Sequence, residues 1–141
     1  MNSPKPDDHG IPDHYRHWQG DGAEDFIGPF FFYMDGDEPC TAFRVRAQHC
    51  NSHKTVHGGV LMTFADYTLC LGANGGANES IVTVSQNNEF TAAATAGDLV
   101  QGRAEVIRRG GSIVFVRCRL QVEGTTVLVA SAVIKRLRSK S

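Results

Sequence analysis

The sequence has neither an excess of one charge sign nor a long uninterrupted apolar run. Fourteen Lys and Arg residues face fifteen Asp and Glu residues, so the formal net charge is −1 with histidine neutral. This balance favours neither nucleic acid nor an anionic membrane surface as a partner. No uncharged apolar stretch approaches the roughly 20 residues that a membrane-spanning helix needs. We therefore expect no nucleic-acid partner and no membrane part.

Paired cysteine motifs are also missing. The four cysteines are scattered and form no C-x-x-C pair: Cys40, Cys50, Cys70 and Cys118. Disulfide frameworks are denser than this, and zinc sites show paired ligand spacing, which the histidines near residue 50 do not match. Residues 1–8 are polar and lack the charged-then-apolar order of a signal peptide. These absences predict reduced thiols, no metal site and a cytoplasmic location.

The length and composition indicate one domain with a substantial core. The chain has 141 residues, of which 41% are hydrophobic. Residues 1–25 are rich in Pro, Gly, Asp and His without sustained periodicity, so we predict a tail or an irregular cap. Residues 26–141 are predicted to form the single domain. It begins with a strand in the aromatic run Phe30–Tyr33 and a half-exposed strand between Glu38 and Ala47.

A helical period replaces this alternation from about Gly58 to Ala73. Apolar residues cover nearly the whole circumference, which is typical of a buried helix, and one stripe contains Val60, Phe64, Tyr67 and Leu71. Gly72, Gly75 and Gly76 are predicted to end this helix, the only one that we predict. Cys70 lies on it and is interpreted as a core residue.

Period-two alternation then returns and continues to the end of the chain. It predicts four strands joined by tight turns, among them a hairpin at Arg109–Ser112 where Gly-Gly tolerates positive φ. Such meandering strands form an antiparallel sheet. We predict an α+β fold, with a curved antiparallel sheet of five to six strands wrapped around one long buried helix. A second subunit would close the side of the helix that stays open.

Asp66 is the one charged residue between Gly58 and Asn78. A carboxylate on a buried helix is costly unless it is paired or hydrogen-bonded, so such a residue is a candidate for a functional site. A structural carboxylate that caps a neighbouring loop is the alternative.

The segment before the helix adds a second candidate. Residues Asn51 to Gly59 run directly into the helix N-terminus, where backbone N–H groups are unsatisfied and the helix dipole favours negative charge. Gly58 and Gly59 allow a ligand to approach the backbone, so an oxyanion hole fits here. Close packing of the helix on the sheet is the alternative explanation for the two glycines.

The spacing of these candidates predicts an assembly. Gly58 and Asp66 are eight residues apart, about 12 Å along a helix at roughly 1.5 Å per residue. They cannot both touch one carbonyl from the same helix. Two antiparallel helices across a two-fold axis would bring Gly58 of one subunit near Asp66 of the other, which predicts a homodimer with two shared sites.

The pattern Asn51, His57-Gly58-Gly59 and Asp66 resembles the active-site pattern of the PaaI-like and THEM-type acyl-CoA thioesterases of the hotdog superfamily. The resemblance covers roughly Phe26 to Leu137 and implies a hotdog fold and hydrolysis of an acyl-coenzyme A thioester. The Gly58 N–H would polarise the thioester carbonyl, and Asp66 would act as general base or nucleophile. The implied assembly is a homodimer or a dimer of dimers.

The same resemblance implies supporting roles for further residues. Asn51 would position the water or thioester, Thr83 would orient the carboxylate or water, and His57 would brace the loop and helix start. The implied coenzyme A contacts are Phe90, Thr91, Arg108, Arg109, Gly110, Gly111 and Ser112. Backbone amides and two guanidiniums suit phosphate, although a solvated hairpin is the alternative. Thioester hydrolysis needs no metal and no cofactor beyond the coenzyme A of the substrate.

Two other functions remain open. The first is a hotdog β-hydroxyacyl thioester dehydratase. Such dehydratases have a His-Phe-Pro loop, whereas this chain has His57-Gly58-Gly59, and the difference disfavours dehydration. A non-catalytic acyl-CoA-binding module would be expected to lack a carboxylate such as Asp66. No G-x-S-x-G motif is present for a serine nucleophile. The identity of the acyl group also stays open, since the aromatic residues suit aromatic and aliphatic groups equally.

Overall fold

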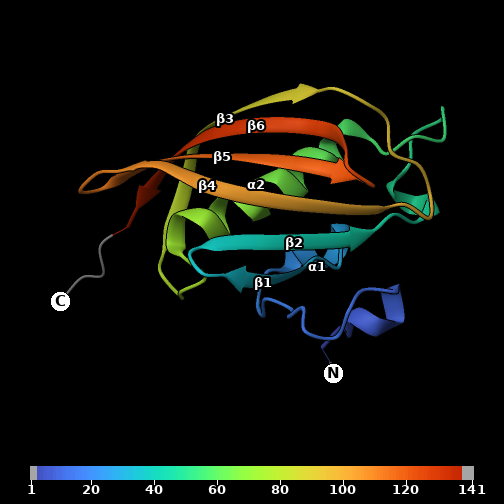
Figure 1. Cartoon of the computed structure of the whole chain (residues 1–141), viewed down its shortest axis with the longest axis horizontal. Helices are drawn as coiled ribbons and strands as arrows, with labels where there is room; N and C mark the ends of the chain where they lie inside the picture. Colours follow the sequence, from blue (N-terminus) through green and yellow to red (C-terminus); the bar gives the residue numbers. More distant parts are fainter. Residues whose placement is uncertain (1–2, 138–141) are drawn as a thin grey trace.

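The computed structural model describes residues 3–137, and six strands form one antiparallel sheet within it. The strand order is β1-β2-β4-β5-β6-β3, and every neighbouring pair is antiparallel (Figure 1). The strands are β1 (Phe31–Asp35), β2 (Glu38–Arg44), β3 (Ile81–Phe90), β4 (Leu99–Arg109), β5 (Ile113–Val122) and β6 (Thr125–Arg136). This number of strands agrees with the prediction of five to six.

The long helix α2 (Gly58–Asn74) begins and ends at local signals. At its start, the His57 side chain accepts from the Gly59 N–H over 2.8 Å, a typical N-cap contact. At its end, Gly75 adopts a φ of +64° and donates to the Leu71 carbonyl. The prediction that Gly72 also ends the helix is wrong. Gly72 lies inside α2, where a Cβ would meet Ala104 and Val116 at 3.1 and 3.2 Å, so glycine permits close packing on the sheet.

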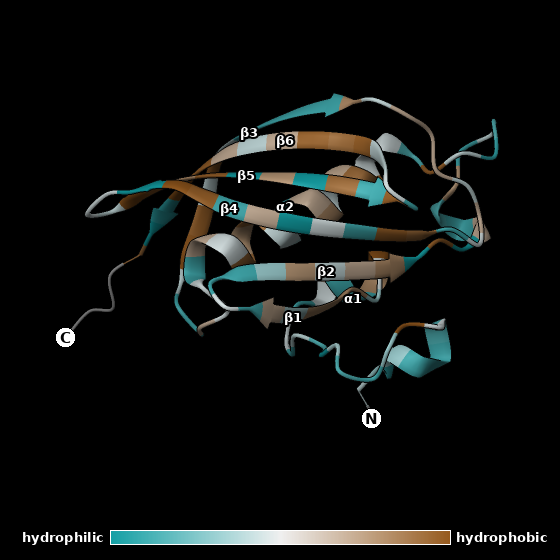
Figure 2. Ribbon diagram, viewed as in Figure 1, coloured by the Kyte–Doolittle hydropathy of each residue, from teal (hydrophilic) through white to brown (hydrophobic). Residues whose placement is uncertain are grey.

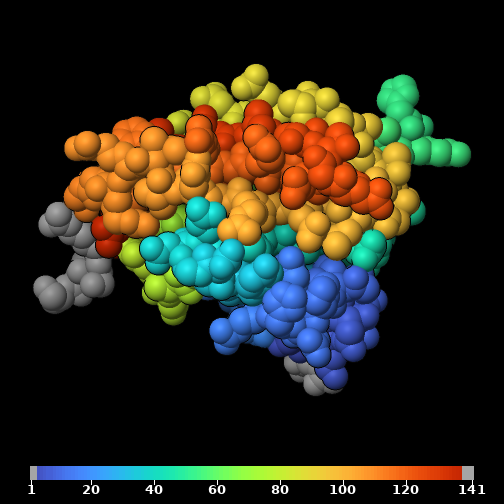
Figure 3. Space-filling view, in the orientation of Figure 1, coloured from blue at the N-terminus to red at the C-terminus, as the bar shows by residue number. Residues whose placement is uncertain are grey.

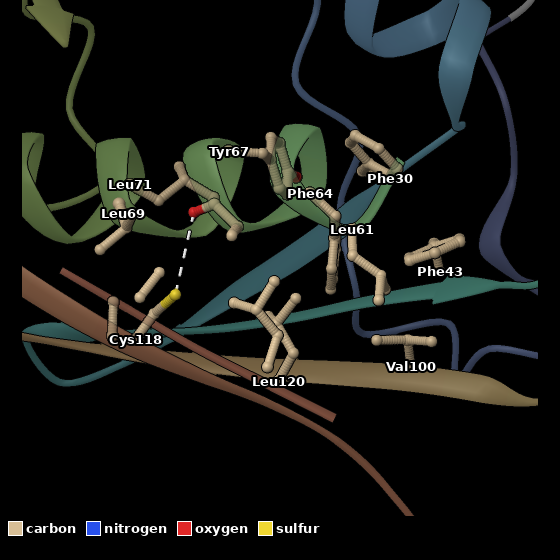
Figure 4. Close-up of a cluster of buried hydrophobic side chains, with 14 of the residues drawn as sticks. Phe30, Phe43, Leu61, Phe64, Tyr67, Leu69, Leu71, Val100, Cys118 and Leu120 are labelled. Carbon is tan, nitrogen blue, oxygen red and sulfur yellow. Dashed lines mark hydrogen bonds between the residues drawn. The ribbon is translucent and has the colours of Figure 1, made fainter. Parts of the chain in front are cut away.

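The curved sheet wraps around α2, and the main core lies between them. The strands alternate between buried and exposed residues, which is visible as alternating colours along β4 and β5 (Figure 2). Leu61, Phe64 and Leu69 of the helix lie in one buried cluster with Val100 and Leu120 of the sheet (Figure 4). This arrangement confirms the predicted α+β hotdog architecture.

The N-terminal segment covers the first two strands. It contains η1 (Pro6–His9) and a six-residue helix, α1 (Gly22–Ile27), which the sequence analysis did not predict. The boundary predicted after residue 25 falls inside α1. Ile11 and Tyr15 are buried against Phe31 and Ala42, and Figure 3 shows the segment packed beside the first strands.

This cover changes the environment of β2. We expected a half-exposed strand, but every residue from Pro39 to Phe43 is buried. One face of β2 meets α2 through Thr41, whose hydroxyl lies 2.8 Å from that of Thr68, and Ala42 on the other face meets the N-terminal segment. The prediction was wrong because the alternation of the strand does not reveal a cover supplied by residues about 30 positions away.

The hairpin between β4 and β5 forms where it was predicted, for a different reason. Its closing bond runs from the Gly110 N–H to the Ile113 carbonyl over 2.8 Å. Neither Gly110 nor Gly111 has a positive φ, whereas Glu123 and Gly124 in the next turn do, at 48° and 83°.

Among residues 3–137, no helix has the length and apolar character to cross a membrane.

Candidate active site

Asp66 lies half-buried near the middle of α2 and is held from the sheet. The Thr83 hydroxyl, on β3, donates to Asp66 Oδ1 over 2.6 Å. The Cys70 Sγ lies 3.7 Å from the same oxygen and 3.5 Å from Thr83 Oγ1. We call Asp66, Cys70 and Thr83 the Asp66 centre. The predicted pairing of Thr83 with the carboxylate is present in the structure, and Cys70 is an additional member.

A second carboxyl group approaches this centre from α1. Glu24 is half-buried, and its pKa is raised to about 8, chiefly by burial and then by the charges of Asp21 and Asp66. Glu24 was not predicted as a site residue because residues 1–25 were predicted to form a tail or an irregular cap. The available signal was Asp21 followed three residues later by Glu24, which is typical of a helix start, and the Asp21 side chain accepts from the Glu24 N–H over 3.0 Å.

The first residue of α2, Gly58, has a backbone N–H that is available as a donor. The three N–H groups that follow it, those of Gly59, Val60 and Leu61, all bond to His57. Among the described residues, no protein group accepts a hydrogen bond from the Gly58 N–H. The Phe90 ring lies over Gly58, at 3.3 Å from the position that a Cβ would occupy. Gly58 and Phe90 line an open hollow of about 430 Å³ together with Thr55, Val56, Leu61, Thr91, Ala92, Ala93 and Ala94.

The loop before α2 is organised by Asn51 and His57. The Asn51 Oδ1 accepts from the N–H groups of His53 and Thr55, at 2.9 and 3.2 Å, so the oxygen of this amide is engaged within the loop. The His57 N–H donates to the His49 carbonyl over 2.9 Å. We call Asn51, His57, Gly58, Phe90 and Thr91 the Gly58 end. The structure therefore places five predicted site residues at one end of α2.

The predicted phosphate contacts lie toward the opposite end of the helix. Arg109 Nη1 donates to the Ala73 carbonyl over 2.7 Å, which satisfies a carbonyl of the last helical turn. Its guanidinium is therefore partly engaged, whereas Arg108 is exposed. Gly110, Gly111 and Ser112 form the adjoining turn.

Thr91, one of the predicted coenzyme A contacts, lies instead at the Gly58 end, where its hydroxyl donates to the Thr126 carbonyl over 2.6 Å.

The site residues thus form two separate groups within one chain. Asp66 does not line the hollow at Gly58. At roughly 1.5 Å per residue, the 17 residues of α2 span about 24 Å, so the two groups and the β4–β5 hairpin follow one another along the helix. Among residues 3–137, no group of three or more His, Cys, Asp or Glu side chains could hold a metal ion.

The amino-acid sequence is similar to a thioesterase family model and to a curated protein named as an esterase. The family model described as "Thioesterase superfamily" matches residues 53–129. The curated protein named "Putative esterase PA0474", from Pseudomonas aeruginosa, is 32% identical over 112 residues, which cover 77% of this chain and 84% of that protein.

Solved structures show the same architecture. A mutant of the phenylacetic acid degradation protein PaaI from Thermus thermophilus has a TM-score of 0.75 and 26% identity, and the match covers 83% of this chain and 100% of that chain. The Escherichia coli PaaI protein has a TM-score of 0.79 at 21% identity, which shows the fold alone, over 86% of this chain and 88% of that one. The predicted PaaI-like resemblance is confirmed.

Proposed function

The chain belongs to the thioesterase superfamily, and from this premise we propose that it hydrolyses acyl-coenzyme A thioesters to a free acid and coenzyme A. One observation carries the proposal: the helix holds an anchored carboxylate, Asp66, and a backbone donor without a protein acceptor, the Gly58 N–H. A base or nucleophile and an oxyanion donor are the two groups that acyl transfer needs.

The two groups have complementary tasks in this reaction. The Gly58 N–H donates to the thioester carbonyl and stabilises the negative charge that develops on its oxygen. Asp66 takes a proton from a water whose oxygen attacks the carbonyl carbon, or attacks that carbon itself before water releases the acid. The carbon–sulfur bond breaks in either route, and the proton from water finally reaches the departing thiolate. The Asn51 amide positions the water or the thioester.

A complete site requires a second copy of the chain. Because Gly58 and Asp66 are separated along one helix, we assign Asp66 to one subunit and the partner's Gly58 to the same carbonyl. Support comes from β3, which is an edge strand with exposed apolar residues: Val82 is 45% and Val84 60% exposed. An unpaired edge of this kind is a ready surface for strand pairing. We propose a homodimer, alone or in a dimer of dimers.

The antiparallel arrangement also assigns a path to coenzyme A. The β4–β5 hairpin lies beside the end of α2, so in the dimer it would extend past the start of the partner's helix. Arg108 and the backbone of Gly110–Ser112 would then meet the phosphates, while the partner's Phe90 and Thr91 line the pantetheine arm. Four free cysteines suit a reducing compartment, so we place this reaction in the cytoplasm.

A thiol-release assay over a panel of acyl-coenzyme A substrates tests the proposal. The wild-type protein should release free coenzyme A, and Asp66→Asn should lower kcat by about 10²- to 10⁴-fold while the fold and dimer persist. Asp37→Asn, in the exposed turn after β1, is the matched control and should leave kcat unchanged.

The same assay separates the other functions. Loss of water from a β-hydroxyacyl thioester without release of thiol would indicate a dehydratase, and binding without turnover would indicate an acyl-CoA-binding module. Near-normal turnover by Asp66→Asn would contradict the role of this carboxylate.

A further inference from the structure

Cys70 has no task in the reaction above, yet its thiol lies inside the Asp66 centre. It follows Asp66 by one helical turn and therefore shares a side of α2 with it. Its Sγ is 3.7 Å from Asp66 Oδ1 and 3.5 Å from Thr83 Oγ1. Cys118, the other cysteine that packs on the middle of α2, instead has its Sγ 4.0 Å from the main-chain oxygen of Ala65 (Figure 4). The two cysteines therefore differ in whether they contact the carboxylate.

The available hydrogens determine the direction of each bond in this cluster. An ionised carboxylate has no hydrogen to donate, so Thr83 is the donor in its 2.6 Å contact with Asp66 Oδ1. A threonine hydroxyl carries a single hydrogen, and none is left for sulfur. The Cys70 thiol is therefore the donor in both of its contacts, and its own single hydrogen is shared between Asp66 Oδ1 at 3.7 Å and Thr83 Oγ1 at 3.5 Å. The thiol and the hydroxyl both donate toward the carboxylate.

We propose that Cys70 is a positioning residue that holds Asp66, both directly and through Thr83, in the orientation used for thioester hydrolysis. The inference rests on the function proposed above. Consecutive hydrogen bonds polarise one another, so a thiol that donates to Thr83 strengthens the bond from Thr83 to the carboxylate. Within residues 3–137 no protein donor is recorded for Asp66 Oδ2. Oδ2 is therefore the oxygen that faces the water or the thioester.

The thiol is suited to act as a permanent donor. Burial, followed by the charge of Asp66, raises the pKa of the Cys70 thiol to about 12, so it keeps its hydrogen at neutral pH. The titratable groups that face Asp66 from other elements are Glu24 on α1 and Cys118 on β5. Burial raises the pKa of Cys118 to about 12 as well. Of these three groups, Glu24 is the one that changes charge close to neutral pH.

Substitution at Cys70 tests the proposal through kcat and its pH profile. Cys70→Ala should lower kcat by roughly threefold to tenfold with little change in KM, which is the effect of one lost hydrogen bond. The acidic limb of kcat/KM should move to higher pH, because the ionised carboxylate loses support. Cys70→Ser, which retains a donor, should restore both properties. Cys118→Ala removes a buried thiol without touching Asp66 and should change neither.

A spectroscopic measurement keeps the proposal testable without turnover. The S–H stretching band of Cys70, assigned by its loss in Cys70→Ala, reports the hydrogen bond of the thiol. Thr83→Val removes the Oγ1 acceptor at nearly constant shape, and Asp66→Asn weakens the acceptor at Oδ1, so at least one of these variants should shift the band. A band that stays in place in both variants overturns the proposal, as does Cys70→Ala with a wild-type kcat and acidic limb. A wild-type protein that hydrolyses no acyl-coenzyme A would instead overturn the proposed function.

Discussion

The Gly58 end and the Asp66 centre lie on one helix but are built in different ways. Local contacts hold the loop and the helix start at the Gly58 end, since the bonds of Asn51 and His57 stay within residues 49–61. Phe90 and Thr91 reach the same end from β3 and the residue after it. Distant elements hold the Asp66 centre, where β3 supplies Thr83, and α1 brings Glu24 close to it. Local spacing can therefore reveal the first region in a sequence, whereas the second depends on the tertiary fold.

The chemistry of the two regions differs as well. The Gly58 end presents the Gly58 N–H at the positive end of the helix dipole, which suits a developing negative charge. The Asp66 centre presents a carboxylate, beside which Glu24 keeps a raised pKa. One supplies a donor and the other an acceptor, and a thioester carbonyl needs both. Experiments that disable each region separately will show whether the two act on the same substrate.

Gly58→Pro is the sharpest change available at the Gly58 end. Proline lacks the N–H but is tolerated at the first position of a helix. The preceding residue, His57, already has the extended ψ of 134° that a following proline requires. We expect kcat to fall by about 10²- to 10³-fold, the usual value of one oxyanion donor.

Gly58→Ala is the control for this change. It adds the same Cβ beside the Phe90 ring, at 3.3 Å, but retains the N–H. Steady-state kinetics should show much higher kcat for the alanine variant than for the proline variant. Equal losses in the two would mean that crowding against Phe90, and not the missing donor, causes the defect.

Mixed dimers test whether the two regions belong to different subunits. Gly58→Pro and Asp66→Asn homodimers should both be nearly inactive. Random reassociation of equal amounts makes half of the dimers mixed, and each mixed dimer has one site with both wild-type groups, so about a quarter of the wild-type activity should return. Activity measured after co-refolding gives the answer, and no recovery in verified mixed dimers would place both groups in one subunit's site.

The same contrast explains how much the sequence could reveal. The helix, the strands along the chain and the Gly58 N–H at the helix start were predictable because periodicity and helix-end signals act over a few residues. The family resemblance supplied the roles of the other residues at the Gly58 end. The pairing of Thr83 with Asp66 was predicted only through a family resemblance. Cys70 was interpreted as a core residue and does pack against the core, but its contact with Thr83 on β3 was not predicted. Arg109 was assigned to phosphate, although it donates to the Ala73 carbonyl. No local pattern encodes such contacts.

Substitution of His49 tests how much this buried side chain stabilises the loop before α2. The residue is 2% exposed, and its ring accepts from the Arg46 N–H over 2.9 Å and donates to the Ile27 carbonyl over 2.6 Å. His49→Ala should lower the free energy of unfolding by about 2–4 kcal/mol, because it leaves a cavity and unpaired polar groups. His53→Ala, at an exposed position of the same loop, should cost little. Urea unfolding compares them, and equal stabilities would show that His49 does not support the loop.

Substitution of Glu24 tests whether a second carboxyl group near the Asp66 centre lowers the free energy of unfolding at high pH. Its pKa rises from 4.5 in the unfolded chain to about 8 in the fold, so the folded state binds the extra proton between these values. The contribution of Glu24 to stability is therefore complete below about pH 4.5 and is lost as the pH rises toward about 8.

Glu24→Gln removes this titration and keeps the shape of a protonated glutamate. The variant should match the wild type in acid and exceed its unfolding free energy at pH 8 by on the order of 1 kcal/mol, a value discounted for partial exposure. Asp13→Asn, an exposed carboxylate in the same N-terminal segment, should not alter the pH dependence. Parallel stability curves for wild type and Glu24→Gln would mean that Glu24 is solvated and that no second carboxyl group is buried beside the Asp66 centre.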